Sequence, residues 1–129
     1  MTTRTAAERS SPERGDIVWV DLDPVRGSEQ AGVRPALVVS ATQYNAASRH
    51  AIVCPITSNV NPWPTKLDLP PGLPIRGAVL LDQVRSVDRR HRGFRHICKA
   101  PPELVLDVTI RVSALLGIVL DPVAEPLIP

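Results

Sequence analysis

The sequence lacks the short motifs by which several large enzyme classes are detected. It contains neither G-x-G-x-x-G nor G-x-x-x-x-G-K-[ST], which excludes the common phosphate-binding loops of nucleotide-dependent enzymes. The serine-hydrolase turn G-x-S-x-G is absent as well, and so are the C-x-x-C pairs and the H-E-x-x-H helix that zinc sites use. We therefore expect neither a cofactor nor a metal ion.

Long apolar runs are also missing. Hydrophobic residues make up 43% of the chain, but Asp, Pro or Arg interrupts every apolar stretch well before the roughly 18 residues that a membrane helix needs. The first ten residues are charged and have no apolar centre, so we expect no secretory signal. A chain of 129 residues suits one domain. These features predict a cytoplasmic protein with no membrane contact.

Cysteine and aromatic residues are scarce. Cys54 and Cys98 lie far apart in the sequence, and a reducing compartment leaves them as thiols rather than a disulfide. Neither stands in a context that would activate a thiolate nucleophile. Aromatic residues account for only 3% of the chain, so Trp63 and Phe94 are either base-stacking faces or part of the core.

The excess of positive charge is small, but it is unevenly distributed. A net charge of +2 does not attract nucleic acid by itself. From Arg85 to Lys99, however, the chain reads RSVDRRHRGFRHICK, in which Asp88 is the single acid. This basic patch either follows a nucleic-acid backbone or forms a solvated face.

Hydrophobic alternation predicts a mainly β domain. We expect strands over Asp16–Leu22, Pro35–Ser40, His50–Thr57, Thr65–Leu69 and Gly77–Val87, and a short helix over Ala41–Arg49. The last of these strands is long and can bend. Closely spaced strands joined by turn-rich loops are typical of a small antiparallel barrel or sandwich.

A helix is expected at the end of the domain. Pro101, Pro102 and Glu103 suit a helix start, and Gly117 is placed to end the helix. The residues at helical spacing that we expect to pack on the barrel are Leu104, Val108, Val112, Leu115 and Leu116. The chain thus divides into a disordered tail over residues 1–13, a domain over 14–118 and a Pro-rich tail over 119–129.

Polar side chains stand at the strand ends and loops, where a rigid fold presents its working groups. A flexible loop from Gly27 to Pro35 delivers Arg34 onto the start of a strand, and a guanidinium has the donor geometry that phosphate oxygens accept. The alternative for Arg34 is a surface ion pair with Glu29. The hydroxyls of Thr57 and Ser58 either donate to a phosphate oxygen or bond their own backbone in a turn.

Asp82 and Gln83 interrupt an otherwise apolar strand. A buried carboxylate or amide is costly unless it is paired or faces a cleft. This pair therefore has either a buried hydrogen-bonding role or a ligand-binding role.

Taken in order, these clusters resemble the MazF/PemK/Kid family of toxins over nearly the whole of Arg14–Ile118. The matching strings are GDIVWVD from Gly15, GSEQAG from Gly27, RPALVVS from Arg34, YN from Tyr44, PITS from Pro55 and DQVRS from Asp82. The resemblance implies an SH3-like small antiparallel barrel with a C-terminal α-helix, the MazF/PemK/CcdB toxin fold, in a homodimer. It also implies the toxin of a type II toxin–antitoxin pair, which cuts single-stranded mRNA at specific sequences without a metal. A MazE-like antitoxin would fill the RNA groove along the dimer interface with an acidic, extended tail.

The functional residues of the family map onto matching positions. Arg34 and Thr57 match the pair regarded as central to cleavage, and Glu29 matches a loop residue that supports it. The residues assigned to RNA binding are Ser58, Asp82, Gln83, Arg85, Ser28, Gln30 and Trp63. The plasmid-borne branch relies on a histidine where this chain has Ser28 and on an arginine where it has Leu80, so we follow the chromosomal MazF pattern.

The reaction that the resemblance implies is attack by the RNA 2′-hydroxyl on the neighbouring phosphorus, which gives a 2′,3′-cyclic phosphate and a 5′-hydroxyl. Arg34 and Thr57 would hold the equatorial oxygens as charge develops. Arginine is a poor proton acceptor, so the general base stays open between Glu29, His50 and water.

Two other readings use the same fold. One is a non-catalytic toxin such as a gyrase poison, although Leu115–Ile118 offers no aromatic anchor of the kind those toxins carry. The other is a degenerate toxin kept as a partner-binding scaffold, against which the intact Arg34 and Thr57 count.

Overall fold

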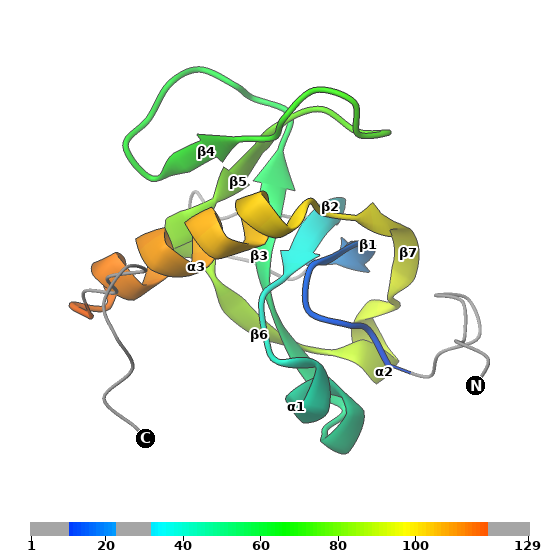
Figure 1. Ribbon diagram of the computed structural model, residues 1–129. Coiled ribbons are helices and arrows are strands. Elements are labelled where there is room, and N and C mark those ends of the chain that lie inside the picture. The colour runs from blue at the N-terminus through cyan, green and yellow to red at the C-terminus, as the bar shows by residue number, and fades with distance from the viewer. Residues whose placement is uncertain (1–10, 23–31, 119–129) are drawn as a thin grey trace.

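The computed structural model describes residues 11–22 and 32–118, which form an antiparallel sheet with one long helix packed on it (Figure 1). The strands are β1 (Asp16–Asp21), β2 (Val33–Val38), β3 (His50–Thr57), β4 (Lys66–Asp68), β5 (Ala78–Leu80), β6 (Arg85–Asp88) and β7 (Arg95–Lys99). The helices are α1 (Thr42–Ala47), α2 (Arg89–Arg92) and α3 (Pro102–Leu115), and a 3₁₀ turn, η2, spans Leu81–Gln83. The predicted fold class, mainly β with a C-terminal α-helix, is confirmed.

The sheet forks at its longest strand. The strand order is β4-β5-β3-β2-β1-β7, while β6 also pairs with β3. The first half of β3 pairs with β6 and its last two residues pair with β5. No pairing among the described strands joins β7 to β4 or β6, so the implied barrel is open rather than closed. Arg85 Nη1 donates to the carbonyl oxygen of Leu22 at 3.3 Å, which links β6 to the end of β1.

Apolar side chains pack on both faces of the sheet. The cluster that α3 covers contains Ile17, Leu37, Cys54, Ile56, Val79, Leu104 and Val108. The second cluster contains Val18, Val20, Leu22, Ala36, Val38, Val53 and Val87. Consecutive residues of a strand point to opposite faces, so burial of both faces explains why β2 and β3 have almost unbroken apolar sequences.

Helix α3 docks through the first part of its predicted apolar face. Leu104 and Val108 are buried, and Val112 is partly buried against the first cluster, as predicted. Leu115 and Leu116 are 51% and 69% exposed, so the prediction that they lie in the core is wrong. The last turn of α3 projects beyond the strands, where no sheet is left to cover it (Figure 1).

The long strand expected over Gly77–Val87 is broken in the middle. β5 and β6 pair with different parts of β3, and η2 connects them. Asp82 is exposed in η2. The polar pair thus leaves the ladder, and Asp82 avoids the cost of burying a carboxylate inside an apolar strand.

The segment before β1 is ordered from Ser11 onward, although the sequence assigned it to a disordered tail. Pro12 is buried, and its carbonyl oxygen accepts a hydrogen bond from Asn45 Nδ2 at 3.1 Å. The rest of the two predicted tails, residues 1–10 and 119–129, lies outside the described residues. Within the described part of the chain, none of the helices has the length and apolar character needed to span a membrane.

Candidate active site at the ends of β2 and β3

Arg34 is the second residue of β2, at the end of the strand where the preceding loop arrives. Its partner on the neighbouring strand β1 is Val20. Gly32 precedes it with a φ of +80°, a conformation that glycine adopts without steric cost. Arg34 is exposed, whereas Ala36 and Val38, which follow on the same face of the strand, are buried in the second cluster. Strand β2 thus extends from the buried core to an exposed end, where Arg34 presents a permanent positive charge.

Thr57 is the last residue of β3 and is 5% exposed. Its Oγ1 accepts a hydrogen bond from the backbone N–H of Asn59 at 3.1 Å, which is the turn that the sequence offered as the alternative to phosphate binding. This bond uses a lone pair of the oxygen and leaves the hydroxyl hydrogen available. No described residue accepts that hydrogen, so Thr57 can form the turn and also donate to a ligand.

The pairing of β2 with β3 brings Arg34 and Thr57 together. Ala36 on β2 faces Pro55 on β3. The recorded pairs end there; continued by two residues along each strand, this register would set Arg34 opposite Thr57. Facing residues of an antiparallel pair point to the same side of the sheet, with Cβ atoms about 5 Å apart. We therefore expect the guanidinium and the hydroxyl to lie within reach of one phosphate group.

The loop after β3 is exposed and is held by Lys66. Lys66 Nζ donates to the carbonyl oxygens of Asn59 at 2.9 Å and Asn61 at 3.2 Å. Ser58 is exposed at the start of this loop, and Trp63 is 65% exposed. This exposure excludes the core position that was one of the two alternatives for Trp63. Its ring is available to stack on a base.

The side of β3 away from β2 carries three of the predicted RNA contacts, Asp82, Gln83 and Arg85. η2 packs against β3 and α3, and it approaches the site from the side opposite to β2. Gln83 is partly buried and has a partner. The guanidinium of Arg85 bonds the carbonyl oxygen of Leu22, so this predicted RNA contact also has a structural role.

Of the candidate side chains for the general base, His50 lies within the described residues and Glu29 does not. Glu29 lies outside the described residues, together with the predicted loop contacts Ser28 and Gln30. His50 is the first residue of β3 and Thr57 is the last. Seven residues at about 3.3 Å each put the two roughly 23 Å apart. His50 therefore cannot act as the base for a phosphate held at Arg34 and Thr57.

The two cysteines are unsuited to nucleophilic catalysis. Both are free thiols, as expected. Burial raises the pKa of Cys54 to about 12, and burial together with the charge of Asp16 raises the pKa of Cys98. Both thiols are therefore protonated near neutral pH. Among the described residues, no group of three or more His, Cys, Asp or Glu side chains could hold a metal ion.

The basic patch of Arg85–Lys99 divides into two kinds of side chain. Some have structural partners: Lys99 Nζ, for example, lies 3.1 Å from Asp16 Oδ1. Arg90, Arg92 and Arg95 form no ion pair with any described acidic residue, and neither does Arg85, which donates to a carbonyl oxygen instead. The sequence analysis missed Arg49, which joins this patch by pairing with Asp88. The only signal for it was that Asp88 is the single acid in the patch.

Comparison with known proteins agrees with these observations. Residues 13–116 match the family model of the PemK-like, MazF-like toxin of type II toxin–antitoxin systems. The endoribonuclease toxin MazF of Escherichia coli strain K12 is 37% identical over 109 residues, which cover 84% of this chain and 97% of that protein.

Solved structures give the same result. MazF from Deinococcus radiodurans has a TM-score of 0.81 at 36% identity, covering 85% of this chain and 100% of that chain. The MazE–MazF complex of the same organism has a TM-score of 0.74 at 33% identity, covering 85% of this chain and 99% of the matched chain. The chain therefore belongs to the PemK-like, MazF-like family of toxins of type II toxin–antitoxin systems, whose matched curated members are endoribonucleases, and this confirms the family that its motifs predicted.

Proposed function

We propose that this chain is the endoribonuclease toxin of a type II toxin–antitoxin pair and that it cuts single-stranded mRNA at the site formed by Arg34 and Thr57. What carries this proposal is the register of β2 with β3, which, continued two residues beyond Ala36 and Pro55, would set Arg34 opposite Thr57. Arg34 supplies a permanent cation, and Thr57 has a hydroxyl hydrogen that no described residue accepts. Both groups can donate to the oxygens of one phosphate. The naming of MazF and PemK relatives as endoribonucleases supports this activity.

The chemistry follows from these two donors. The 2′-oxygen of a ribose forms a bond to the adjacent phosphorus while the bond from phosphorus to the 5′-oxygen breaks, which leaves a 2′,3′-cyclic phosphate and a 5′-hydroxyl. The 2′-hydroxyl proton passes to Glu29 or water, and the 5′-oxygen takes up a proton. Arg34 and Thr57 bind the non-bridging oxygens, and each well-aimed donor lowers the barrier by about 3 kcal/mol. The nucleophile belongs to the substrate, so this step needs no metal-bound water.

The surroundings of the site favour a partner that covers it. Val33, which precedes Arg34, is 60% exposed, and Val60 and Trp63 in the loop after Thr57 are 54% and 65% exposed. Exposed apolar side chains of this kind mark interaction surfaces when they cluster. We therefore propose a homodimer whose interface forms the RNA groove, in the cytoplasm where mRNA is found. A MazE-like antitoxin would occupy the groove with an acidic tail, and the solved MazE–MazF complex supports this partner.

A cleavage assay tests the proposed function. The purified protein is incubated with a long single-stranded RNA in EDTA, and the new ends are mapped. We expect cuts at a short sequence, with 2′,3′-cyclic phosphate and 5′-hydroxyl ends. Arg34→Ala and Thr57→Val should each lower the rate on the order of 10²- to 10³-fold. Thr57→Ser keeps the hydroxyl and should retain most of the activity.

Two results would contradict the proposal. Intact RNA after incubation with the wild-type protein would exclude the nuclease activity. Undiminished growth arrest by an Arg34→Ala variant would point instead to a non-catalytic toxin such as a gyrase poison. Light scattering on the purified protein measures the oligomeric state, and a monomer at assay concentrations would exclude the dimeric groove.

A further inference from the structure

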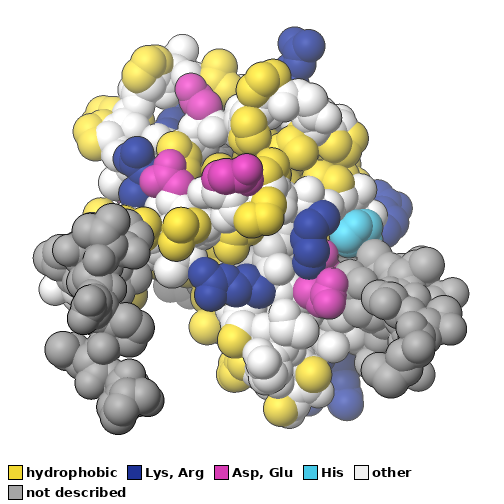
Figure 2. All heavy atoms as spheres, in the orientation of Figure 1, with side chains coloured by type: hydrophobic (Ala, Val, Ile, Leu, Met, Phe, Trp, Pro, Cys, Tyr) yellow, Lys and Arg dark blue, Asp and Glu magenta, His cyan; other side chains and the backbone are white. Residues whose placement is uncertain are grey.

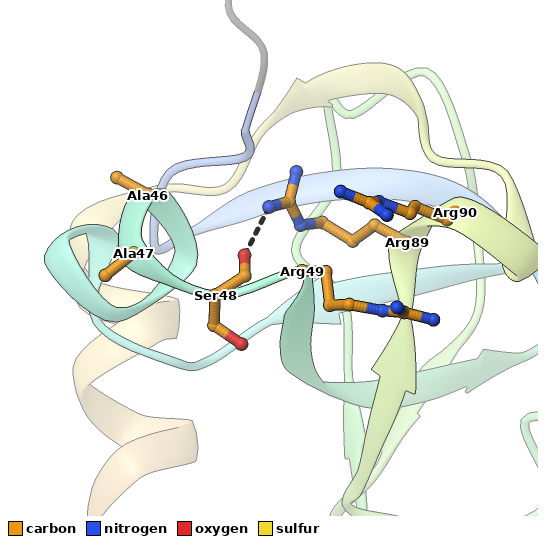
Figure 3. A pocket seen from close by; sticks show the side chains of 6 residues that line it. All are labelled: Ala46, Ala47, Ser48, Arg49, Arg89 and Arg90. Carbon is orange, nitrogen blue, oxygen red and sulfur yellow. Dashed lines mark hydrogen bonds between the residues drawn. The ribbon is translucent and has the colours of Figure 1, made fainter.

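A second concentration of positive charge lies where the end of α1 meets the start of α2, in a cavity of about 490 Å³ (Figure 3). We call it the arginine pocket, and its lining residues are Ala46, Ala47, Ser48, Arg49, Arg89 and Arg90. Three of them are arginines and none is acidic. The face crossed by α3 is different, because acidic, basic and apolar side chains are interspersed there (Figure 2). Among the residues that the structure describes, the lining of the arginine pocket therefore carries charge of one sign.

Arg89 is held rigidly in this pocket. Its Nη2 donates to the carbonyl oxygen of Asn45 at 2.9 Å and to the carbonyl oxygen of Ser48, the bond drawn in Figure 3. Both carbonyls lie at the C-terminal end of α1, which has no basic residue in its own last turn. A cation is favoured at that end of a helix. The fixed guanidinium loses little conformational freedom when a ligand binds.

Asp88, the acidic residue that the described part of the chain places beside the pocket, already has hydrogen-bonding partners. Arg49 donates from Nε at 2.9 Å and also from Nη2 to Oδ2 of Asp88. Oδ1 of Asp88 accepts from the backbone N–H of Arg90 at 3.0 Å. The hydrogen bond from Arg49 lowers the pKa of Asp88 to about 2, so this carboxylate is ionised near neutral pH. Asp88 thus compensates the charge of Arg49, whereas Arg90 forms no ion pair with a described acidic residue.

Arg90 is the member of the pocket that is ready to bind an anion. It is exposed and forms no ion pair with any acidic residue in the described ranges. Figure 3 shows its side chain directed toward that of Arg89. Both arginines line the pocket, so an anion with several oxygens that binds there can accept hydrogen bonds from more than one guanidinium.

We infer that the arginine pocket binds a backbone phosphate of single-stranded RNA outside the cleavage site. This inference rests on the proposed nuclease function. Guanidinium forks match phosphate oxygens, and the Ser48 hydroxyl, whose oxygen accepts from the backbone N–H of His50 at 3.0 Å, still has a hydrogen to donate. The walls formed by Ala46 and Ala47 leave room for a phosphate but offer no large apolar side chain to anchor a peptide.

The pocket is well separated from the active site. Arg49 immediately precedes β3 and Thr57 ends it, so eight residues at about 3.3 Å place the two sites roughly 26 Å apart along the strand. An RNA that fills only the cleavage site cannot reach the pocket. A longer RNA can contact both sites, and its affinity should then depend more strongly on salt.

Binding measurements over a salt series test the inference. Fluorescence anisotropy is recorded with 2′-O-methyl RNA, which lacks the nucleophile, at lengths of about 4 and about 16 nucleotides. For the long RNA, Arg90→Gln should reduce the slope of log affinity against log salt by about 0.7, the value for one phosphate contact with a single strand. Arg90→Lys should restore the slope. Arg111→Gln, which removes the same charge from α3, should leave it unchanged.

Several outcomes would overturn the inference. One is that wild type and Arg90→Gln have the same slope of log affinity against log salt for the long RNA. Another is that Arg90→Gln reduces the slope for the short RNA as much as for the long RNA. A third is that Arg90→Gln weakens an acidic antitoxin peptide but not RNA, since the pocket would then bind protein. A fourth is that inorganic phosphate binds through Arg90 while the long RNA does not respond, since the ligand would then be a free anion. If the wild type cuts RNA but the slopes are equal, only this inference fails; if it neither binds nor cuts RNA, the proposed function fails.

Discussion

Replacement of Gly77 by alanine tests whether the contact between the start of β5 and the end of β3 fixes the position of Thr57. Gly77 has a φ of +148°, and a Cβ atom built there would lie 2.3 Å from the carbonyl oxygen of Thr57 and 3.1 Å from Ile56 Cγ2. Real Cβ contacts do not fall below 3.0 Å, so the backbones must separate by at least 0.7 Å. The strained φ costs about 1–3 kcal/mol, and the overpacked contact costs about 1–3 kcal/mol more. We expect Gly77→Ala to lower the free energy of unfolding by about 2–6 kcal/mol.

The same displacement should reduce cleavage. A shift approaching 1 Å at a group that positions the substrate costs on the order of 10²-fold in rate. Urea unfolding gives the stability, and RNA cleavage is measured at a temperature where the variant is folded. Gly72→Ala is the matched control, because Gly72 has a φ of +95° and no described atom within 4 Å of a built Cβ. It should lose about 1 kcal/mol from backbone strain and keep its activity. A Gly77→Ala protein as stable and as active as Gly72→Ala would refute this reasoning.

Three further predictions concern the core, an ion pair and a thiol. Val108→Ala should lower the free energy of unfolding in urea by about 2 kcal/mol, because Val108 is buried. Leu116→Ala, beyond the sheet, should change it by less than about 0.5 kcal/mol. An equal loss of stability in the two variants would contradict the exposure of the last turn of α3. The Arg49 hydrogen bond lowers the pKa of Asp88 to about 2 in the folded protein, so the stability gained from ionised Asp88 is present above about pH 4 and lost as the pH falls toward 2. The stability difference between wild type and Asp88→Asn should shrink in that window, and a constant difference would contradict the assignment. Burial raises the pKa of Cys54 to about 12, so mass spectrometry should find it alkylated by iodoacetamide at pH 8 only after unfolding in urea, and labelling of the folded protein would count against its burial.

The local sequence pattern was sufficient to predict a strand where one continuous segment forms that strand. The prediction of β3 over His50–Thr57 matches the structure, because an apolar run of strand length is bounded by turn residues. The break inside Gly77–Val87 was missed because β3 supplies separate partners for β5 and β6, which the apolar pattern of the segment does not reveal. Strand β7 was missed for a similar reason: its exposed basic residues look like a solvated face, and only its pairing with β1, about 80 residues earlier, makes it a strand.

The candidate site also combines residues that the sequence identified with an arrangement that only the strand pairing supplies. The motifs identified Arg34 and Thr57, but the expectation that they lie opposite each other comes only from the register between β2 and β3. His50 was a reasonable candidate base from its type, and the length of β3 excludes it. Arg49 drew no attention in the sequence because its partner Asp88 lies 39 positions away and meets it only through the pairing of β3 with β6. Long-range pairings therefore decide which charged groups work together.

Strand β3 connects both proposed RNA contacts, and the construction of the core explains why they lie at its ends. Both faces of the sheet are buried around β3, so a charged or strongly polar group in its middle would lose its hydration without compensation. Side chains reach solvent just beyond the two ends, at Arg49 before the strand and at Ser58 after it. A rigid strand then sets the separation between Thr57 and the arginine pocket at roughly 26 Å. An extended RNA can meet both sites only at one offset between the cut and the second phosphate, so lengthening the RNA on one side of the cut should improve binding and lengthening it on the other should not.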